Sequence, residues 1–431
     1  MSTVRFYACI LIMCVVSFSV EAANRPTYTK DIAPILNENC ISCHRPNDIA
    51  PMSLLNYQEV RPWAKSIARQ VYERNMPPWH ADPEYGHFKN ERTLTQKQIN
   101  TIVEWSRQGA TQGKRGDMPK VPEIDTSGWR LGEPDYTVTF GAVSIPAGGR
   151  DQFKDLEAQT NLPEDSWVTA LEIMPGDRSV VHHVILWQGQ KNQQNGWIGA
   201  WGAGGDPLVF RKGTGRLLKK NVPVIGDMHY HPSGTATTDQ TRIGLHIAKS
   251  EKEIKSPLTN LWVINTFFEI PPGAANHEVR SSHIFPEAAK IISLAPHMHY
   301  RGKDFTYTAT YPDGQVETLL KVSKYDFNWQ TSYELKKPIS VPKGTKIECV
   351  AHFDNSATNL SNPDYNKAVR FGNESYDEMM IGFIDYVPDS VSLPSESKAG
   401  GTGGVTMILT SLVLLAGIGF VGHRIGTAIF G

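Results

Sequence analysis

Three short motifs in this 431-residue chain place histidine and methionine side chains at spacings that suit metal binding. His182 and His183 are adjacent in VVHHVILW, and a histidine–tyrosine–histidine cluster follows in GDMHYHPSG. The third motif is APHMHYRGKDF, and a methionine in YDEMMIGF comes last. Imidazole nitrogens bind Cu, Zn, Fe or Ni, whereas a thioether ligand favours copper, because Cu(I) is a soft ion. The motifs therefore predict two copper sites.

The backbone period of a β-strand determines which of these side chains can share a metal ion. Side chains two residues apart point to the same face, so His297 and His299 can reach one ion. Met298 between them faces the other way, and we expect it to pack in the core. Adjacent His182 and His183 point to opposite faces of a regular strand, so a shared ion there requires a β-bulge or a strand end.

A different motif lies near the N-terminus, where CISCH covers residues 40–44. Two thiols spaced by two residues can add to the vinyl groups of a haem, and the histidine that follows then lies under the iron. Cys40, Cys43 and His44 are therefore predicted to hold one covalent haem c. The alternative is a thioredoxin-like redox motif, which is weaker because no βαβ pattern surrounds these residues.

A c-type haem also needs a sixth ligand and enclosing helices. Met76 in ERNMPPWHADP is the predicted sixth ligand, since a thioether there raises the reduction potential relative to bis-histidine ligation. Met52 and His80 are the alternatives. The run TLTQKQINTIVEWSRQG has a capping box and one apolar face, which are typical of a helix. We expect a small all-α cytochrome c domain over residues 26–115.

From about residue 130 the helical period gives way to short alternating runs such as PDYTVTFGAVSIPAGG and FTYTATYPDGQVETLL. The second run contains Asp313-Gly314 between two strand-like segments, which predicts a β-hairpin. A long series of short strands favours antiparallel sandwiches. We expect two all-β sandwiches, at 130–265 and 266–390, with one metal site on each.

Both ends of the chain have the composition of membrane-addressing segments. Residues 1–23 fit a signal peptide, and residues 391–404 form a Ser/Gly-rich linker. Residues 405–422 are predicted to be a transmembrane helix, with a buried core helix as the alternative. The expected location is the inner (cytoplasmic) membrane, single-pass, with the other domains in the periplasm. A formal net charge of −1 gives no reason to expect a nucleic-acid partner.

The order of the motifs, His-His, then HYH, then HMH, then DEM, resembles the copper type II, ascorbate-dependent monooxygenases. The resemblance covers roughly residues 135–385, and it implies two jelly-roll-like sandwiches. It implies an electron-storing copper held by His182, His183 and His229. It also implies a catalytic copper, where O₂ binds, held by His297, His299 and Met379.

Several neighbouring side chains compete with these ligands. His231 is the alternative to His229, and we interpret it as a partner of the ligands rather than a ligand. Met380 is the alternative to Met379. Three other histidines have no motif around them and are predicted to be structural, namely His277, His283 and His352.

The chain departs from the family pattern at positions that bear on the substrate. Peptide-amidating members carry an arginine two residues before the H-x-H and a tyrosine four residues after the ligand methionine, and both help to hold a substrate carboxylate. Ala295 and Phe383 stand at those positions here, which favours a neutral or apolar substrate. Members also form a disulfide to the residue after the ligand methionine. That residue is Met380 here, so Cys349 is expected to be free.

These observations lead to one hypothesis and several alternatives. The chain is predicted to be a copper-dependent monooxygenase that hydroxylates a C–H bond of a small organic substrate with O₂. Electrons would come through the fused haem from a periplasmic or quinol-linked donor. The main alternative is a membrane-tethered haem/copper electron-transfer or sensory protein without hydroxylase activity. A reductase, or a type 1 copper protein built on Cys349 and His352, is a further alternative.

Overall fold

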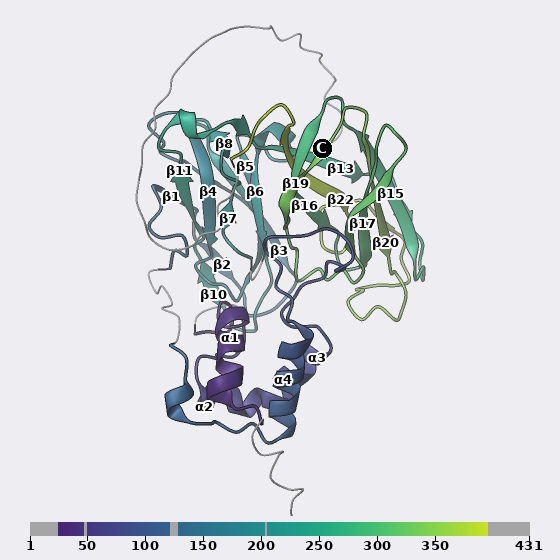
Figure 1. The fold of residues 1–431 in the computed structure, drawn as a ribbon. Coiled ribbons are helices and arrows are strands. Elements are labelled where there is room, and N and C mark those ends of the chain that lie inside the picture. Colours follow the sequence, from purple (N-terminus) through teal and green to yellow (C-terminus); the bar gives the residue numbers. More distant parts are fainter. Residues whose placement is uncertain (1–24, 47–49, 121–127, 203–204, 395–431) are drawn as a thin grey trace, which may run out of the picture. The chain divides into compact units, whose positions relative to one another are not determined.

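The structure is a computed structural model that describes residues 25–46, 50–120, 128–202 and 205–394. Its regular structure is mostly β, and its α-helices all precede the first strand (Figure 1). The four α-helices are α1 (Ala33–Asn39), α2 (Tyr57–Val60), α3 (Ala64–Tyr72) and α4 (Gln96–Arg107). Single turns are formed by η2 (Tyr28–Ile32), η3 (Arg61–Trp63), η4 (Arg115–Asp117), η5 (Gln194–Gly196) and η6 (Glu251–Glu253).

The helical part has a small core of its own. Helix α4 begins at the capping box formed by Thr95 and Gln98, and it buries Ile99, Ile102 and Trp105 on one face. These side chains pack with apolar residues of η2, α1 and α3. The helices are short, however, and α4 is the longest of them with 12 residues.

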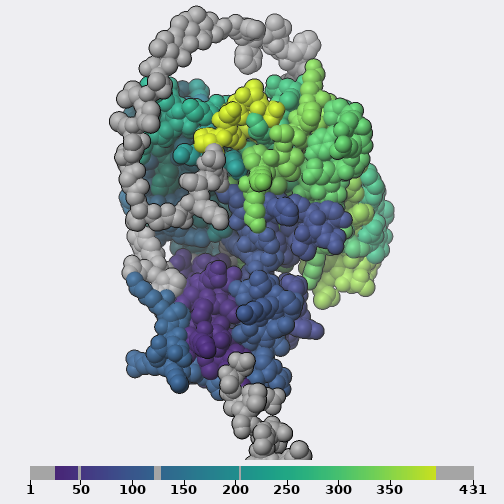
Figure 2. Space-filling model, in the orientation of Figure 1, coloured from purple at the N-terminus to yellow at the C-terminus, as the bar shows by residue number. Residues whose placement is uncertain are grey.

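The expected fold class, with an all-α cytochrome c domain at 26–115 and a transmembrane helix, is therefore wrong. The chain between α3 and α4 is not helical and joins a β-core instead. Ala81 forms a β-bridge with Val322, and Phe88 forms one with Leu335. Both side chains are buried in the C-terminal core. Figure 2 shows part of this blue segment on the molecular surface beside the green C-terminal sandwich. The sequence here lacks the 3.6-residue apolar period that a helix needs.

The N-terminal sandwich consists of two main sheets that share one core. The first sheet has the order β1-β11-β4-β8-β12, with β7 paired to β4. Its strands are β1 (Tyr136–Thr139), β4 (Ser166–Met174), β7 (Leu208–Val209), β8 (Thr214–Leu218), β11 (Arg242–Ile247) and β12 (Ser256–Pro257). The second sheet has the order β3-β9-β5-β6, with β3 (Gln152–Ala158), β5 (Val181–Gln188), β6 (Trp197–Gly202) and β9 (Val224–Tyr230). A small ladder pairs β2 (Val143–Ile145) with β10 (Thr237–Asp239).

The C-terminal sandwich repeats this two-layer arrangement around a second core. One sheet has the order β13-β22-β16-β19, with β13 (Thr259–Asn265), β16 (Ala289–His297), β19 (Tyr333–Val341) and β22 (Met380–Pro388). The other has the order β15-β20-β17-β18, with β15 (His277–Ile284), β17 (Gly302–Thr310), β18 (Val316–Val322) and β20 (Lys346–Phe353). Strands β14 (Glu269–Ile270) and β21 (Val369–Arg370) pair separately. Because β13 already belongs to the second sandwich, the chain crosses over ahead of the expected boundary at 265.

Burial along the strands shows which sheets are covered on both faces. Strand β20 alternates strictly between buried and half-buried residues, as expected for one face on a core. Strand β16 is buried at nearly every position, so both of its faces are covered. On its outer face, Ile292 packs with Leu258 and Val387. The Asp313-Gly314 hairpin is confirmed, and Gly314 adopts the positive φ of 86° that favours glycine.

No helix among the described residues has the length and hydropathy to cross a membrane. The expected single-pass location in the inner membrane is corrected accordingly, because nothing described supports an anchor. The segment on which that expectation rested, 405–422, lies outside the described residues, as does the expected signal peptide at 1–23.

One buried ion pair joins the two sandwiches. Arg216 of β8 donates to Asp385 of β22 at 2.6 Å, and Asn260 donates to the same carboxylate at 2.7 Å. Only 7% of the Arg216 side chain is exposed. We predict that Asp385→Ala lowers the free energy of unfolding by about 3 kcal/mol, because it leaves the guanidinium buried without its counter-charge. Denaturant unfolding measures this change.

Asp165→Ala is the matched control, because Asp165 pairs in solvent with Lys219, the residue that directly follows strand β8. An exposed pair contributes little to stability, so this variant should unfold at the wild-type denaturant concentration. Equal midpoints for the two variants would contradict the role assigned to Asp385.

Candidate metal centre

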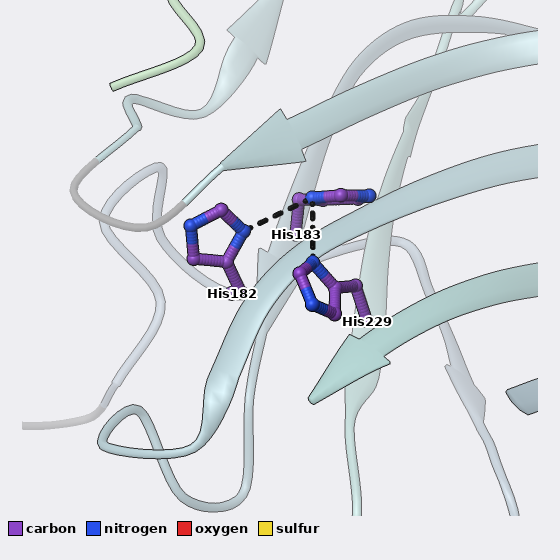
Figure 3. A group of neighbouring side chains, drawn as sticks. All are labelled: His182, His183 and His229. Atoms are coloured by element: carbon purple, nitrogen blue, oxygen red, sulfur yellow. Dashed lines mark hydrogen bonds between the residues drawn. The ribbon is translucent and has the colours of Figure 1, made fainter. Parts of the chain in front are cut away.

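The first histidine group lies at one end of the β3-β9-β5-β6 sheet. His182 and His183 come from β5, and His229 of β9 is the register partner of His183. The pairing of β5 with β9 shifts between Val181 and His183. This irregularity is the bulge that two adjacent ligands require, and it turns both rings to the same side. Figure 3 shows the three rings facing one another.

The three rings meet through the same ring atom. The Nδ1 atom of His183 lies 3.1 Å from that of His182 and 3.3 Å from that of His229. One ligand atom from each residue can be chosen so that all lie within 4.8 Å of one another. Burial lowers the pKa of His182 to about 3 and holds the pKa of His183 well below its ordinary value. Neutral imidazoles keep the lone pairs that a metal needs, so the group fits a copper ion.

The outward side of this group is held by a carboxylate. Asp151 accepts a hydrogen bond from Nε2 of His229 at 2.8 Å and another from Nδ1 of His231 at 2.8 Å. Burial alone would raise the pKa of Asp151, but the bonds from the two imidazoles outweigh it and hold the pKa well below its usual range. His231 is 63% exposed and lies outside the group of three. Phe153 stacks on the His229 ring at 4.4 Å.

The second histidine group lies where β16 ends in the C-terminal sandwich. The rings of His297 and His299 are 5.2 Å apart. Nδ1 of His297 bonds to Oε1 of Gln330 at 2.7 Å, and Nδ1 of His299 lies 3.2 Å from the Asp377 carbonyl. A neutral imidazole that donates from Nδ1 offers the lone pair of Nε2. Burial lowers the pKa of His297 to about 4 and that of His299 well below its ordinary value. Met298 points into the core, where it is fully buried.

The expected methionine ligand directly follows a buried glutamate in the sequence. Glu378 is fully buried and accepts hydrogen bonds from the backbone N–H groups of His299 at 2.8 Å and Arg301 at 2.6 Å. Burial raises the pKa of Glu378 to about 8, although these bonds and the Arg301 charge oppose the rise. The next residue, Met379, is half-buried, whereas Met380 lies in the core. Two imidazoles and a thioether are a donor set that suits copper.

The two groups approach each other between the sandwiches. The His183 and His297 rings are 6.4 Å apart. Phe327 stacks on His182 at 4.8 Å and lies 5.9 Å from the His299 ring. A cavity of about 70 Å³ borders both groups, and a cavity of about 160 Å³ shares several of its walls, including Trp201 and Gln330.

The predicted haem residues lie in the helical part. Cys40 caps α1, and the next turn brings the His44 N–H to the Cys40 carbonyl at 2.9 Å. Both thiols of the motif are free. Nδ1 of His44 lies 3.2 Å from the Met52 carbonyl, which leaves Nε2 of the ring available. Burial lowers the pKa of His44. These features fit covalent haem with an axial histidine. Met76 follows α3. The backbone N–H of His80 bonds to Tyr333 of the C-terminal sandwich.

The comparisons with known proteins bear on the second group. Residues 269–397 match the family model of the copper type II ascorbate-dependent monooxygenase, C-terminal domain. The match supports the copper type II monooxygenase family. It supports a copper enzyme, an oxidoreductase that uses O₂ and a substrate. No curated protein matches the chain.

Solved structures with some likeness are distant ones. The VP2 subviral particle of infectious bursal disease virus is 8% identical, with a TM-score of 0.19 over 62% of this chain and 74% of the other. A two-domain protein of unknown function from Bacteroides fragilis is 11% identical, with a TM-score of 0.17 over 58% of this chain and 94% of the other. These TM-scores are too low to support a shared fold.

Several residues around the two histidine groups were not found from the sequence. They are Asp151, Tyr300, Phe327, Gln330 and Glu378. Glu378 adjoins Met379, so the DEM motif itself carried a signal for it. Tyr300 lies within APHMHYRGKDF, but nothing in that motif points to its partner. The other three lie in segments without a motif, and only the fold brings them to the rings. Of the histidines predicted to be structural, His352 pairs with Asp304 at 2.7 Å, away from both groups.

The geometry separates the two candidates in the HYH motif. We predict that His229→Ala reduces the copper content of the chain from two ions to one, because it removes one of three converging Nδ1 atoms. His231→Ala should retain both ions, since its ring faces solvent and Asp151. Elemental analysis of copper per chain measures the difference. Copper loss in the His231 variant alone would reverse the assignment.

A second prediction concerns the carboxylate behind the catalytic group. Glu378→Gln should weaken copper binding at the His297 site about 10–100-fold, because partners of metal ligands contribute on that scale. The amide of glutamine has only one oxygen. The backbone N–H groups of His299 and Arg301, which each bond to a separate oxygen of Glu378, would then no longer each have an acceptor oxygen. Competition with a copper chelator measures the affinity. Glu348→Gln, at a surface pair with Lys346, should leave it unchanged. Equal affinities in the two variants would contradict the prediction.

Proposed function

We propose that this chain is a copper-dependent monooxygenase that hydroxylates a C–H bond of a neutral or apolar substrate. The supporting observation is the cavity whose walls include one histidine of each group, His183 and His297. A substrate held there lies next to a residue of both groups. The family match over residues 269–397 supports monooxygenase chemistry in general.

The walls of this cavity indicate the kind of substrate. Among the described residues that line it, none carries a formal charge, and Ala295 and Phe383 stand where peptide-amidating members are expected to hold a carboxylate. The remaining apolar wall is formed by Ile185, Ala200, Trp201 and Pro296. Gln330, Thr331 and Ser332 supply the polar groups nearby. A carboxylate placed here would lose its hydration without gaining a cation, so a neutral molecule fits better.

The reaction sets requirements on the chain. Hydroxylation follows R–H + O₂ + 2e⁻ + 2H⁺ → R–OH + H₂O, so two electrons must come from a donor. Bound copper supplies one-electron storage and O₂ activation. The protein residues hold the imidazoles neutral and fixed, with Phe327 stacked on the His182 ring and Phe383 lying 6.2 Å from the His297 ring. The separate partners of His229 and His297 keep each ring in one orientation.

Electrons from the donor are proposed to reach the coppers through haem c. Cys40, Cys43 and His44 would hold this haem, with Met76 as its sixth ligand. The chain after Met76 runs directly onto the C-terminal sandwich. The backbone N–H of Asp82 donates to the Lys321 carbonyl at 2.8 Å, and the ring centroids of Trp79 and Tyr333 are 5.0 Å apart. This segment leads from the helical part, which carries the predicted haem residues, to the loop that carries Phe327 and Gln330.

Composition is the first test of this function. The full chain, produced with haem-c maturation and reconstituted with copper, should contain two copper ions and one covalent haem. Elemental analysis and a pyridine haemochrome assay measure both. A Cys40→Ala/Cys43→Ala variant should retain copper and lose covalent haem. A chain that takes up no copper would exclude the monooxygenase.

Turnover is the second part of the test. Stopped-flow mixing of reduced haem with the copper(II)-loaded chain should reoxidise the haem, and ¹⁸O₂ should label the product of a neutral apolar substrate. Haem reoxidation without labelled product across the substrate set would favour a haem/copper electron-transfer or sensory protein. A glycine-extended peptide serves as the charged comparison, and its preferred turnover would contradict the substrate class.

A further inference from the structure

We propose that Asp151 is a positioning residue of the three-histidine site, and that it links this site to the catalytic one through Tyr300. The inference rests on the proposed function, because it assumes copper at His182, His183 and His229. It concerns a carboxylate that is not itself a metal ligand. Its effect is on the orientation and the electronic character of one ligand ring.

The position of Asp151 is built into the fold. It directly precedes β3, whose Phe153 is the register partner of His229 in β9. Phe153 therefore covers one face of the His229 ring, while Asp151 bonds to its edge. Only 7% of the Asp151 side chain is exposed. The ring is thus held by stacking and by a hydrogen bond from the same short segment.

The carboxylate has three partners, and each donates to it. One oxygen, Oδ2, accepts from Nε2 of His229 at 2.8 Å and from the Tyr300 hydroxyl at 2.9 Å. The other oxygen accepts from Nδ1 of His231 at 2.8 Å. Three donors satisfy a carboxylate that is largely withdrawn from water. His231 accordingly has a part in the site although its ring faces away from the metal.

The bond to Nε2 determines what the opposite nitrogen can do. An imidazole that donates from Nε2 has its lone pair on Nδ1, and Nδ1 of His229 faces Nδ1 of His183 at 3.3 Å. A carboxylate behind a ligand imidazole also raises the basicity of the ring. Its negative charge stabilises Cu(II) more than Cu(I), because the charge of the ion is larger. Asp151 should therefore lower the reduction potential of this copper.

The third partner belongs to the other sandwich. Tyr300 directly follows His299, and its ring lies 4.7 Å from Phe327. The shared oxygen of Asp151 therefore contacts a ligand ring of one site and the residue next to a ligand of the other. A shift of the C-terminal sandwich at Tyr300 would disturb the hydrogen bond to His229. This arrangement couples the geometry of the two copper sites without a shared ligand.

The test uses the full chain with the Asp151→Asn variant. The amide keeps the shape and can still accept from His229, but it lacks the charge. We expect the three-histidine site to bind Cu(II) about 10–100-fold more weakly and Cu(I) with a smaller loss. Each tenfold difference between the two losses raises the reduction potential by about 59 mV. Chelator competition and spectroelectrochemistry of the copper EPR signal measure these values.

Two further variants separate positioning from general damage. Asp304→Asn removes the charge from another Asp–His pair, that of His352, and should leave both coppers unchanged. Tyr300→Phe leaves the bond between Asp151 and His229 in place and keeps the charge of Asp151, so it should change the potential of this copper less than Asp151→Asn does. Equal potentials in the wild type and Asp151→Asn would overturn the inference.

Copper binding by the wild-type chain distinguishes an error in the role of Asp151 from an error in the proposed function. If the wild-type chain binds no copper at the three-histidine site, the function itself is wrong. If it binds copper there and Asp151→Asn leaves affinity, potential and EPR spectrum unchanged, only the role of Asp151 is wrong. If Asp151→Asn fails to fold, Asp151→Glu keeps the charge at a longer reach. The Asp151→Glu variant should shift the EPR spectrum but keep a reduction potential close to that of the wild type. A potential raised as much as the loss of the charge predicts would overturn the role of the charge.

Discussion

The structure depends on keeping buried imidazole rings neutral and fixed. His182, His183, His297 and His299 all lie where burial lowers their pKa, so none carries a charge at neutral pH. A buried neutral imidazole still has one donor and one acceptor to satisfy. In both groups an outer nitrogen of a ligand ring is taken by a protein partner, Asp151 for His229 and Gln330 for His297. In the first group the Nδ1 atoms of His182 and His229 both lie close to that of His183, an arrangement that suits a metal ion.

The two sandwiches reach this result with different backbones. In the N-terminal sandwich a bulge in β5 brings adjacent residues to one side, and the rings meet through Nδ1. In the C-terminal sandwich the histidines are two residues apart at the end of β16, and their Nδ1 atoms turn to the protein. Each arrangement needs a buried carboxylate. Asp151 receives side-chain donors and has a lowered pKa, whereas Glu378 receives backbone donors, is fully buried, and has a raised pKa.

Much of the β-structure and the proximity of the histidines within each motif could be predicted from the sequence, because both follow local rules. The alternation of apolar residues and the Asp313-Gly314 turn are local signals, and so is the need for a bulge at His182. The helical domain was overestimated for the same reason: α4 has a clear local pattern, and the non-helical chain before it was assigned to the same domain. Asp151, Tyr300 and Phe327 could not be predicted, because their partners are distant in sequence and depend on how two sandwiches meet.

The segment after α3 gives the helical part a direct structural relation to the metal groups. Asp82 and Ala81 pair with the end of β18, and the Ser323 hydroxyl bonds to Asp82 at 3.3 Å. The loop that begins there carries Phe327, which stacks on His182, and Gln330, which bonds to His297. Trp79 and Gln330 both line the cavity of about 160 Å³. A displacement of this segment would therefore affect Phe327 and Gln330, each of which contacts one histidine group, so the helical part and the two histidine groups are structurally linked.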